Sequence, residues 1–156
     1  MNIEIKLLER AYETSACAEL MAGSEPWLTL RRTFDDCLKL LNEPGKEVYV
    51  ARDGESVVGF VVLQLRGPFT GYIQSIGVMP EWRSRGIGTR LLRRLIAIAR
   101  KRDVQGFMGL ILGNNVRMMS LFHRAGVPVE STLERGVFTV RIRSARLDAT
   151  SPGTSA

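Results

Sequence analysis

Residues 72–112 contain an apolar strand pattern, a glycine-rich turn, an amphipathic helix pattern and a second apolar strand pattern, in that order. The helix is predicted from apolar residues that recur at helical spacing after Pro80, namely Ile87, Leu91, Leu95 and Ile98. A strand, a helix and a strand in succession predict a parallel crossover, because a short hairpin cannot join two parallel strands. The fold must therefore include a sheet with at least one parallel pair of strands.

The rest of the chain predicts antiparallel strands around this unit. Asp53-Gly54 separates two strand-like runs and is typical of a hairpin turn, because both residues tolerate positive φ. The second of these runs, residues 56–65, is apolar on both faces and is expected to lie centrally. Pro128 favours an edge position for the strand that contains it. The other strands are expected at residues 3–7, 127–133 and 137–143.

Three more helices are predicted from apolar stripes: Tyr12, Ala16 and Leu20; Leu30, Phe34, Cys37 and Leu41; and Met118, Leu121, Phe122 and Ala125. Asn114 or Asn115 can cap the last of these helices. The pattern predicts a single α+β domain over residues 1–146, with residues 147–156 as a disordered tail. Its sheet is expected to be mixed but mostly antiparallel, with about six or seven strands and flanking helices.

The composition is that of one soluble globular domain, with 156 residues, 45% of them hydrophobic and 24% charged. No apolar run approaches the roughly 18 residues of a membrane span, and the first nine residues do not resemble a leader peptide. Cys17 and Cys37 lie in helical patterns beside apolar neighbours, which favours reduced, buried thiols over a catalytic thiol. We therefore expect a cytoplasmic protein, without a metal site or a membrane partner.

Positive charge is concentrated in one segment of the chain. The net charge is +6, and residues 83–102 hold eight basic side chains and no acidic one. Such a segment favours an anionic ligand. Nucleic acid is the rival partner, but no interleaved basic and aromatic residues or known binding motif supports it, and none is expected to bind.

The glycine-rich turn comprises residues 83–89, and the predicted helix starts within it, near Gly86. Unpaired amides and the positive end of a helix favour an anion there, and the lack of a Cβ at Gly86 and Gly88 lets a diphosphate approach the backbone. A Rossmann fingerprint needs a third glycine where Leu91 stands, and a P-loop needs a Gly-Lys-Ser/Thr sequence that is absent. An ordinary helix start with convenient glycines is the simpler alternative.

At these residues the sequence resembles the GNAT acetyltransferase superfamily. The signature Arg/Gln-x-x-Gly-x-Gly/Ala is matched by Arg83, Gly86 and Gly88, and its apolar lead-in by residues 73–80. A second block, residues 115–127, resembles the family's asparagine, apolar helix and glycine segment. The resemblance covers about residues 1–144 and implies the GNAT fold, with a strand, helix and strand crossover at its centre.

The resemblance also implies acetyl-CoA as the co-substrate and an amine as the acceptor. Its diphosphate would lie on the amides of residues 85–89 beside Arg83, and its pantetheine arm would pair with the backbone near Ile76 and Val78. The Val78 amide is then the candidate donor to the thioester oxygen. Asn115 would contact acetyl-CoA, cap the following helix, or do both. The full set of cofactor-binding candidates is Ile76, Val78, Arg83, Arg85, Gly86, Ile87, Gly88, Thr89 and Asn115.

Two expected catalytic groups are missing. The tyrosine that protonates the departing thiolate in many family members is matched by Phe122, and His123 beside it is expected on the surface rather than as an acid or base. The family's frequent strand glutamate is also absent. A water held by Gln74, Ser75 or the backbone could replace it, as could an acceptor amine of low pKa. The remaining alternative is a carboxylate from Glu25, Asp35, Asp36 or Glu130.

The acceptor region is expected at the acidic N-terminal helices. Glu25 and Trp27 could bind a cationic amine through charge and ring face, although Trp27 could instead only staple the helix. Arg141 and Arg143 are expected on an exposed strand face rather than in an anionic-substrate site. The sequence thus predicts an acyl-CoA-dependent N-acyltransferase that acts as a monomer or homodimer. A non-catalytic acyl-CoA sensor is the alternative.

Overall fold

The computed structural model describes residues 2–24, 27–65, 70–102, 104–126 and 128–143. The elements follow in this order: β1 (Ile3–Leu7), α1 (Ala11–Ala22), α2 (Phe34–Leu41), β2 (Lys46–Asp53), β3 (Ser56–Leu65), β4 (Thr70–Val78), a 3₁₀ turn η1 (Pro80–Trp82), α3 (Ile87–Lys101), β5 (Gly106–Leu112), α4 (Val116–Arg124), β6 (Val129–Glu134) and β7 (Val137–Arg143). No helix within these ranges is long and apolar enough to cross a membrane.

The strands form one seven-stranded sheet in the order β1-β2-β3-β4-β5-β7-β6. Among the strands of the described residues only β4 and β5 pair in parallel, and α3 connects them, as the strand, helix and strand pattern predicts. The central position expected for residues 56–65 and the edge position expected for the strand near Pro128 are both confirmed. Val127, where that strand was expected to begin, lies outside the described residues.

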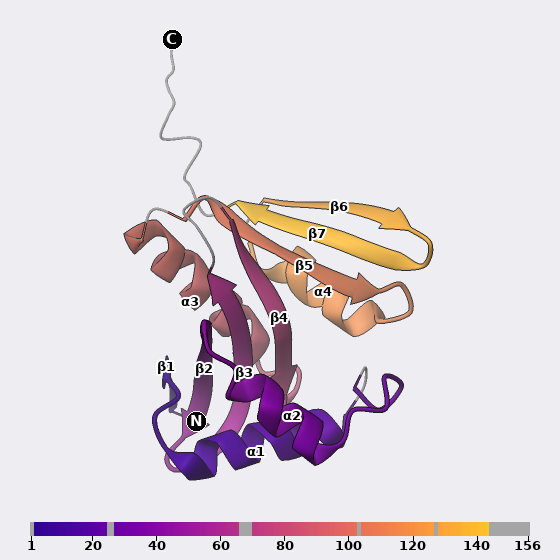
Figure 1. The fold of residues 1–156 in the computed structure, drawn as a ribbon. Coiled ribbons are helices and arrows are strands. Elements are labelled where there is room, and N and C mark those ends of the chain that lie inside the picture. Colours follow the sequence, from indigo (N-terminus) through magenta and orange to yellow (C-terminus); the bar gives the residue numbers. More distant parts are fainter. Residues whose placement is uncertain (1, 25–26, 66–69, 103, 127, 144–156) are drawn as a thin grey trace.

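Helices cover both faces of the sheet (Figure 1). The apolar face of α3 packs with β2, β3 and β4 in one core cluster, which also contains Phe107 from β5 and Phe122 from α4. On the opposite face, α1 and α2 pack against alternate residues of β2 and β3, including Val50 and Phe60. Alternate residues of β2, and of β3 from Phe60 onward, thus fill two separate cores.

Two predicted helix stripes extend too far. Leu30 lies in a turn before α2 and is 51% exposed, and Phe34 at the start of α2 is 37% exposed, whereas Cys37 and Leu41 are buried as expected. Tyr12 is also exposed, because α1 buries the face that carries Cys17 and Met21. Helical spacing gives the period of a helix, but the packing partner decides which face is buried.

The hairpin between β2 and β3 differs from the expected one by one residue. Asp53 pairs with Ser56 as the last residue of β2, so the two-residue turn is Gly54-Glu55 rather than Asp53-Gly54. Gly54 has φ of 64°, while Asp53 and Glu55 are not in the left-handed region. One glycine in the first turn position is therefore sufficient here.

Candidate functional site

The parallel strands β4 and β5 separate part of the way along their length. Their pairing runs from Thr70–Gly106 to Ile73–Gly109 and then stops, although β4 continues to Val78. The separation begins beside a bulge, because Val62 of β3 faces Ser75 while Leu63 faces Ile73, which leaves Gln74 as the extra residue of β4. Figure 1 shows the two strands diverging on the side of α4.

Two contiguous cavities occupy this opening. One, of about 290 Å³, lies between the glycine loop, α3 and α4, and we call it the loop cavity. The other, of about 360 Å³, lies between the separated strands, and we call it the strand cavity. Four residues line both: Trp27, Ile76, Asn115 and Met118. The opening therefore provides one continuous groove.

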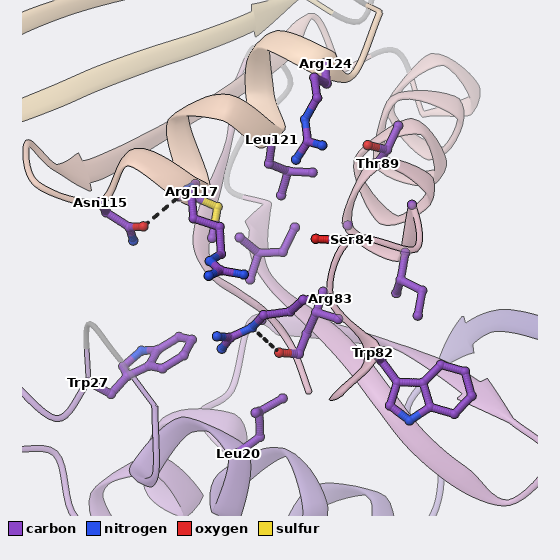
Figure 2. Close-up of a pocket in the computed structure, with 17 residues that line it drawn as sticks. Leu20, Trp27, Trp82, Arg83, Ser84, Thr89, Asn115, Arg117, Leu121 and Arg124 are labelled. Carbon is purple, nitrogen blue, oxygen red and sulfur yellow. Dashed lines mark hydrogen bonds between the residues drawn. The ribbon is translucent and has the colours of Figure 1, made fainter. Parts of the chain in front are cut away.

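The glycine loop forms one wall of the loop cavity. Gly86 is the N-cap of α3 and has φ of 82°, so a residue with a Cβ would be strained there. Ser84 also has a positive φ, of 65°, and such strain is concentrated at functional sites. The first amides of α3 have no helical partner and lie at its positive end. Ser84, Gly86, Ile87, Gly88 and Thr89 all line the cavity (Figure 2).

Gly88 has a packing role that the sequence did not indicate. A Cβ at Gly88 would lie 2.9 Å from both terminal carbons of Leu121 in α4, whereas nothing lies within 4 Å of a Cβ at Gly86. The missing side chain of Gly88 therefore allows α3 and α4 to pack closely. Gly86 has open space beside its backbone, and Gly88 also lines the loop cavity, so the place of Gly88 beside the diphosphate stays a prediction.

Two arginines converge in the loop cavity. Arg83 donates a hydrogen bond from Nε to the Val78 carbonyl oxygen at 3.1 Å. Its guanidinium points toward that of Arg117 from α4 (Figure 2). Burial, together with the positive charge of Arg117, lowers the pKa of Arg83. Neither arginine belongs to an ion pair with a described carboxylate. The charge of Glu81 offsets that of Arg83 only in part, so the two arginines together favour an anion between them.

Sequence reasoning missed Arg117 and the third arginine of this cavity, Arg124. Their spacing of seven residues places them on one face of α4, which was the available signal. Arg85 was expected at the site, but its guanidinium lies over the Trp82 ring, 4.7 Å from the centroid, and it lines neither cavity. Its backbone amide remains at the loop.

The other arginines of residues 83–102 do not form a single anion-binding face. Arg90 donates to the Ile3 carbonyl oxygen at 2.9 Å, and Arg93 donates to that of Ala125 at 3.0 Å. Arg102 forms an ion pair with Glu47. These three side chains therefore hold α3 to its neighbours. Fewer basic side chains of residues 83–102 are left to bind a polyanion than the sequence indicates.

The backbone of β4 faces the groove at alternate residues. The Met79 amide donates to the Val58 carbonyl oxygen at 2.8 Å, so Met79 faces β3. Because amides alternate in direction along a strand, the N–H of Val78 points away from β3, and that of Ile76 does the same. Both residues line the loop cavity. The expected contacts between the pantetheine arm and the backbone of Ile76 and Val78 require this orientation.

Asn115 is the N-cap of α4, and its Oδ1 accepts the Met118 amide at 3.2 Å. The capping alternative is therefore confirmed. Asn115 also lines both cavities, so its amide group borders the groove.

The strand cavity contains the expected polar residues of β4 but no described carboxylate. Gln74 and Ser75 both line it, and Gln74 Oε1 is buried without a hydrogen-bond partner in the described chain. Phe122 is 2% exposed and forms part of the wall, whereas His123 is exposed and lines neither cavity. Phe122 and His123 thus occupy the core and surface positions expected of them.

The carboxylates weighed as alternative bases lie elsewhere or are not described. Glu25 lies outside the described residues. Asp36 accepts the Thr33 amide at 3.0 Å; this hydrogen bond is the main cause that lowers the pKa of Asp36. Asp35 is exposed at the start of α2, and Glu130 is exposed with a carboxylate oxygen 3.8 Å from Arg143. None of the three described carboxylates lines either cavity.

Trp27 is mainly a core residue that also reaches the groove. It is 8% exposed, and its ring centroid lies 6.0 Å from that of Phe60. Its side chain lines both cavities, so a contact between Trp27 and the acceptor stays a prediction. The two cysteines, Cys17 and Cys37, are buried free thiols and line neither cavity. Burial raises the pKa of Cys17 to about 12, which argues against a catalytic thiol.

Comparison with known proteins gives a consistent result. Residues 8–127 match the acetyltransferase (GNAT) family. The N-alpha-acetyltransferase RimI of Mycobacterium tuberculosis is 35% identical over 105 residues, which cover 63% of this chain and 63% of the relative. The chain thus spans less than two thirds of the length of that curated relative.

Solved structures share the fold at lower identity. The PaiA N-acetyltransferase of Thermoplasma acidophilum, in complex with coenzyme A, superimposes with a TM-score of 0.72 at 19% identity, covering 92% of this chain and 99% of that one. A GNAT family acetyltransferase from Elizabethkingia anophelis with acetyl-CoA bound gives a TM-score of 0.61 at 19% identity, covering 91% and 97%. At these identities the likeness shows the fold.

Proposed function

Because this chain belongs to the acetyltransferase (GNAT) family, we propose that it transfers an acetyl group from acetyl-CoA to the nitrogen of a primary amine. The observation that carries the proposal is the separation of β4 from β5 beyond Ile73–Gly109, which opens a groove between the strands and the glycine loop. A groove with an arginine-rich end at the glycine loop and a free backbone edge along β4 fits a long thioester that carries a diphosphate.

The loop would hold the diphosphate through its backbone. The amides of residues 85–89 lie at the positive end of α3, and Gly86 leaves the space for a phosphate oxygen to approach. Arg117 and Arg124 add positive charge from α4. The pantetheine arm would pair with the free backbone edge of Ile76 and Val78, beside Asn115.

Val78 is proposed to stabilise the charge that develops during transfer. Its amide points into the groove and would donate to the thioester oxygen, while Arg83 holds the Val78 carbonyl in place at 3.1 Å. Holding the donor and acceptor side by side supplies a further part of the rate. The departing thiol has a pKa near 8.5, so it can leave as thiolate without the proton donor that Phe122 cannot provide.

The acceptor amine must lose a proton before it attacks. Gln74 and Ser75 line the strand cavity and are proposed to orient the amine or a water that takes the proton. An α-amino group, with a pKa near 8, needs less help than a lysine with a pKa near 10.4. The relative that is 35% identical is named as an N-alpha-acetyltransferase, which supports an α-amino acceptor. The free, buried thiols support a cytoplasmic location.

A non-catalytic acyl-CoA sensor is the second candidate. It is favoured by Phe122 at the expected proton-donor position and by the lack of a carboxylate among the described residues of the strand cavity. A sensor would bind acetyl-CoA as the enzyme does but would not consume it with any amine.

Two measurements test these proposals. Calorimetric titration of acetyl-CoA should give binding that Gly86→Trp abolishes, because the indole fills the space beside the loop. Arg117→Gln should weaken binding about tenfold, the effect of one lost charge-assisted contact. Arg94→Gln, which removes an exposed arginine outside the groove, is the matched control and should bind normally.

Thiol release with a broad panel of amines then separates the two functions. Turnover with any amine supports the transferase, and binding without turnover supports the sensor. Absence of acetyl-CoA binding to the folded protein would refute both.

A further inference from the structure

The charged side chains that line the groove all carry the same sign. In the described chain they are four arginines: Arg83, Arg117 and Arg124 in the loop cavity, and Arg32 in the strand cavity. The sequence led us to expect that an acidic region would attract a cationic acceptor. The acidic side chains of the described N-terminal segment instead lie outside both cavities, so the groove would repel a polycation.

Arg32 is held close to the groove but is not neutralised by an ion pair. Its backbone amide donates to the Trp27 carbonyl oxygen at 3.0 Å, which ties the turn to a residue that lines both cavities. Its charge contributes to lowering the pKa of Asp36, but the Asp36 carboxylate is occupied by Thr33. Arg32 belongs to none of the ion pairs between described residues. Its guanidinium is therefore available to a carboxylate of the acceptor.

The rest of the strand cavity is mostly apolar. Leu30 and Leu110 line it and are 51% and 57% exposed, so two large apolar side chains face an unfilled space. Leu40, Leu112 and Val137 extend the same wall. Apolar surface of this kind, next to one charged group, fits an apolar side chain attached close to an anionic group.

The chemistry of proton loss narrows the type of amine. No described carboxylate lines the strand cavity to act as a base. Near neutral pH an α-amino group of a peptide is deprotonated a few hundred times more often than a lysine side chain, given pKa values of about 8 and 10.4. Without a strong base, this difference favours a peptide N-terminus.

We propose that the acceptor is the N-terminus of a peptide that begins with an apolar residue followed closely by an acidic one. The apolar side chain lies against Leu30 and Leu110, and the acidic side chain pairs with Arg32. The amine lies near Gln74 and Ser75. The inference rests on the proposed acetyl transfer and adds the class of acceptor.

The test uses four peptide amides and the full chain. Three begin Leu-Asp, Leu-Asn and Leu-Lys and are otherwise identical, and the fourth has a blocked N-terminus and offers only a lysine amine. We expect kcat/KM for the Leu-Asp peptide to exceed that for Leu-Asn about tenfold through KM, the effect of one charge-assisted contact. Leu-Lys should be poorer still, and the blocked peptide should be poorest.

Arg32→Gln should remove the preference for Leu-Asp over Leu-Asn by raising KM for the Leu-Asp peptide. Arg31→Gln is the matched control, because Arg31 is an exposed neighbour that lines neither cavity, and it should keep the preference. Equal rates for the three free N-termini, a preference for Leu-Lys or for the blocked peptide, or a preference that survives Arg32→Gln would overturn the inference.

A further assay with the polyamine spermidine as acceptor distinguishes failure of the inference from failure of the proposed function. If spermidine is acetylated while the Leu-Asp peptide is not, the inference fails and the acetyl transfer stands. If no amine is acetylated although acetyl-CoA binds, the proposed function fails and the inference fails with it.

Discussion

Replacing Glu13 by Gln tests how a buried ion pair holds α1, the helix that carries Leu20 to the loop cavity. Glu13 is fully buried, and its Oε1 accepts the amides of Glu9 and Arg10, both at 3.0 Å. Its Oε2 accepts Arg52 Nη1, also at 3.0 Å. Gln retains an oxygen for the two amides, but its amide nitrogen would face the guanidinium of Arg52, so that two donors oppose each other.

The expected cost of Glu13→Gln is about 2 kcal/mol. Breaking a deeply buried ion pair costs about 3–5 kcal/mol, but Arg52 keeps a second carboxylate, Glu4, at 3.1 Å. A charge-assisted hydrogen bond is worth about 1.5–3 kcal/mol, which sets the lower estimate. In a domain of this size such a loss lowers Tm by about 4–8 °C. Thermal unfolding followed by circular dichroism at pH 7 measures it.

The pH dependence of this difference identifies its cause. Burial raises the pKa of Glu13, but the amides of Glu9 and Arg10 and the charge of Arg52 outweigh it, so the pKa is lowered. A carboxyl with a lowered pKa stabilises the fold above its unfolded value of about 4.3, and this contribution is lost as pH falls through the folded value. The difference in Tm between the wild type and Glu13→Gln should therefore shrink below about pH 4.3.

Glu55→Gln is the control, because Glu55 pairs with Arg10 at 3.3 Å on the exposed surface and should change Tm little. Two results would refute the reasoning. One is a Glu13→Gln protein as stable as the wild type at pH 7. The other is a difference in Tm that stays constant down to pH 3.

Gly86→Ala and Gly45→Ala should each lower the free energy of unfolding by about 1–2 kcal/mol, because both glycines have φ of 82° and open space around them. Only Gly86→Ala should weaken acetyl-CoA binding in calorimetry. Equal binding by the two variants would contradict a binding site at the loop. Cys17, with its pKa raised to about 12, should resist a thiol reagent at pH 8 until the chain unfolds; rapid labelling of the native protein would show that the thiol is accessible. Phe122→Tyr should raise kcat by up to about 10²-fold and leave KM unchanged. The gain should appear mostly below pH 8.5, where the departing thiolate benefits from a proton donor. An unchanged kcat would mean that a side chain at this position does not reach the leaving group.

Local sequence determined much of the architecture. The apolar period of residues 87–98 and the two flanking apolar runs gave the parallel crossover, because these patterns depend only on near neighbours. Gly86 identified the loop, because a residue without a Cβ at the start of a helix lets an anion approach the backbone; its left-handed φ was seen only in the structure. Phe122 in the core, His123 on the surface and Asn115 as a cap were also predictable from position on a helix.

Tertiary packing decided which side chains meet in the groove. Arg83 and Arg117 are far apart in the sequence, and only the contact between α3 and α4, allowed by Gly88 against Leu121, brings them together. The apolar stripes placed Leu30 in a helix and in the core, but it lies in a turn at the strand cavity. The acidic N-terminal helices favoured a cationic acceptor, whereas the described cavity walls hold only arginines as charged groups. The net charge of a segment counts every side chain, whichever way it points. The charge of a binding site depends only on the side chains that the fold directs into its cavity.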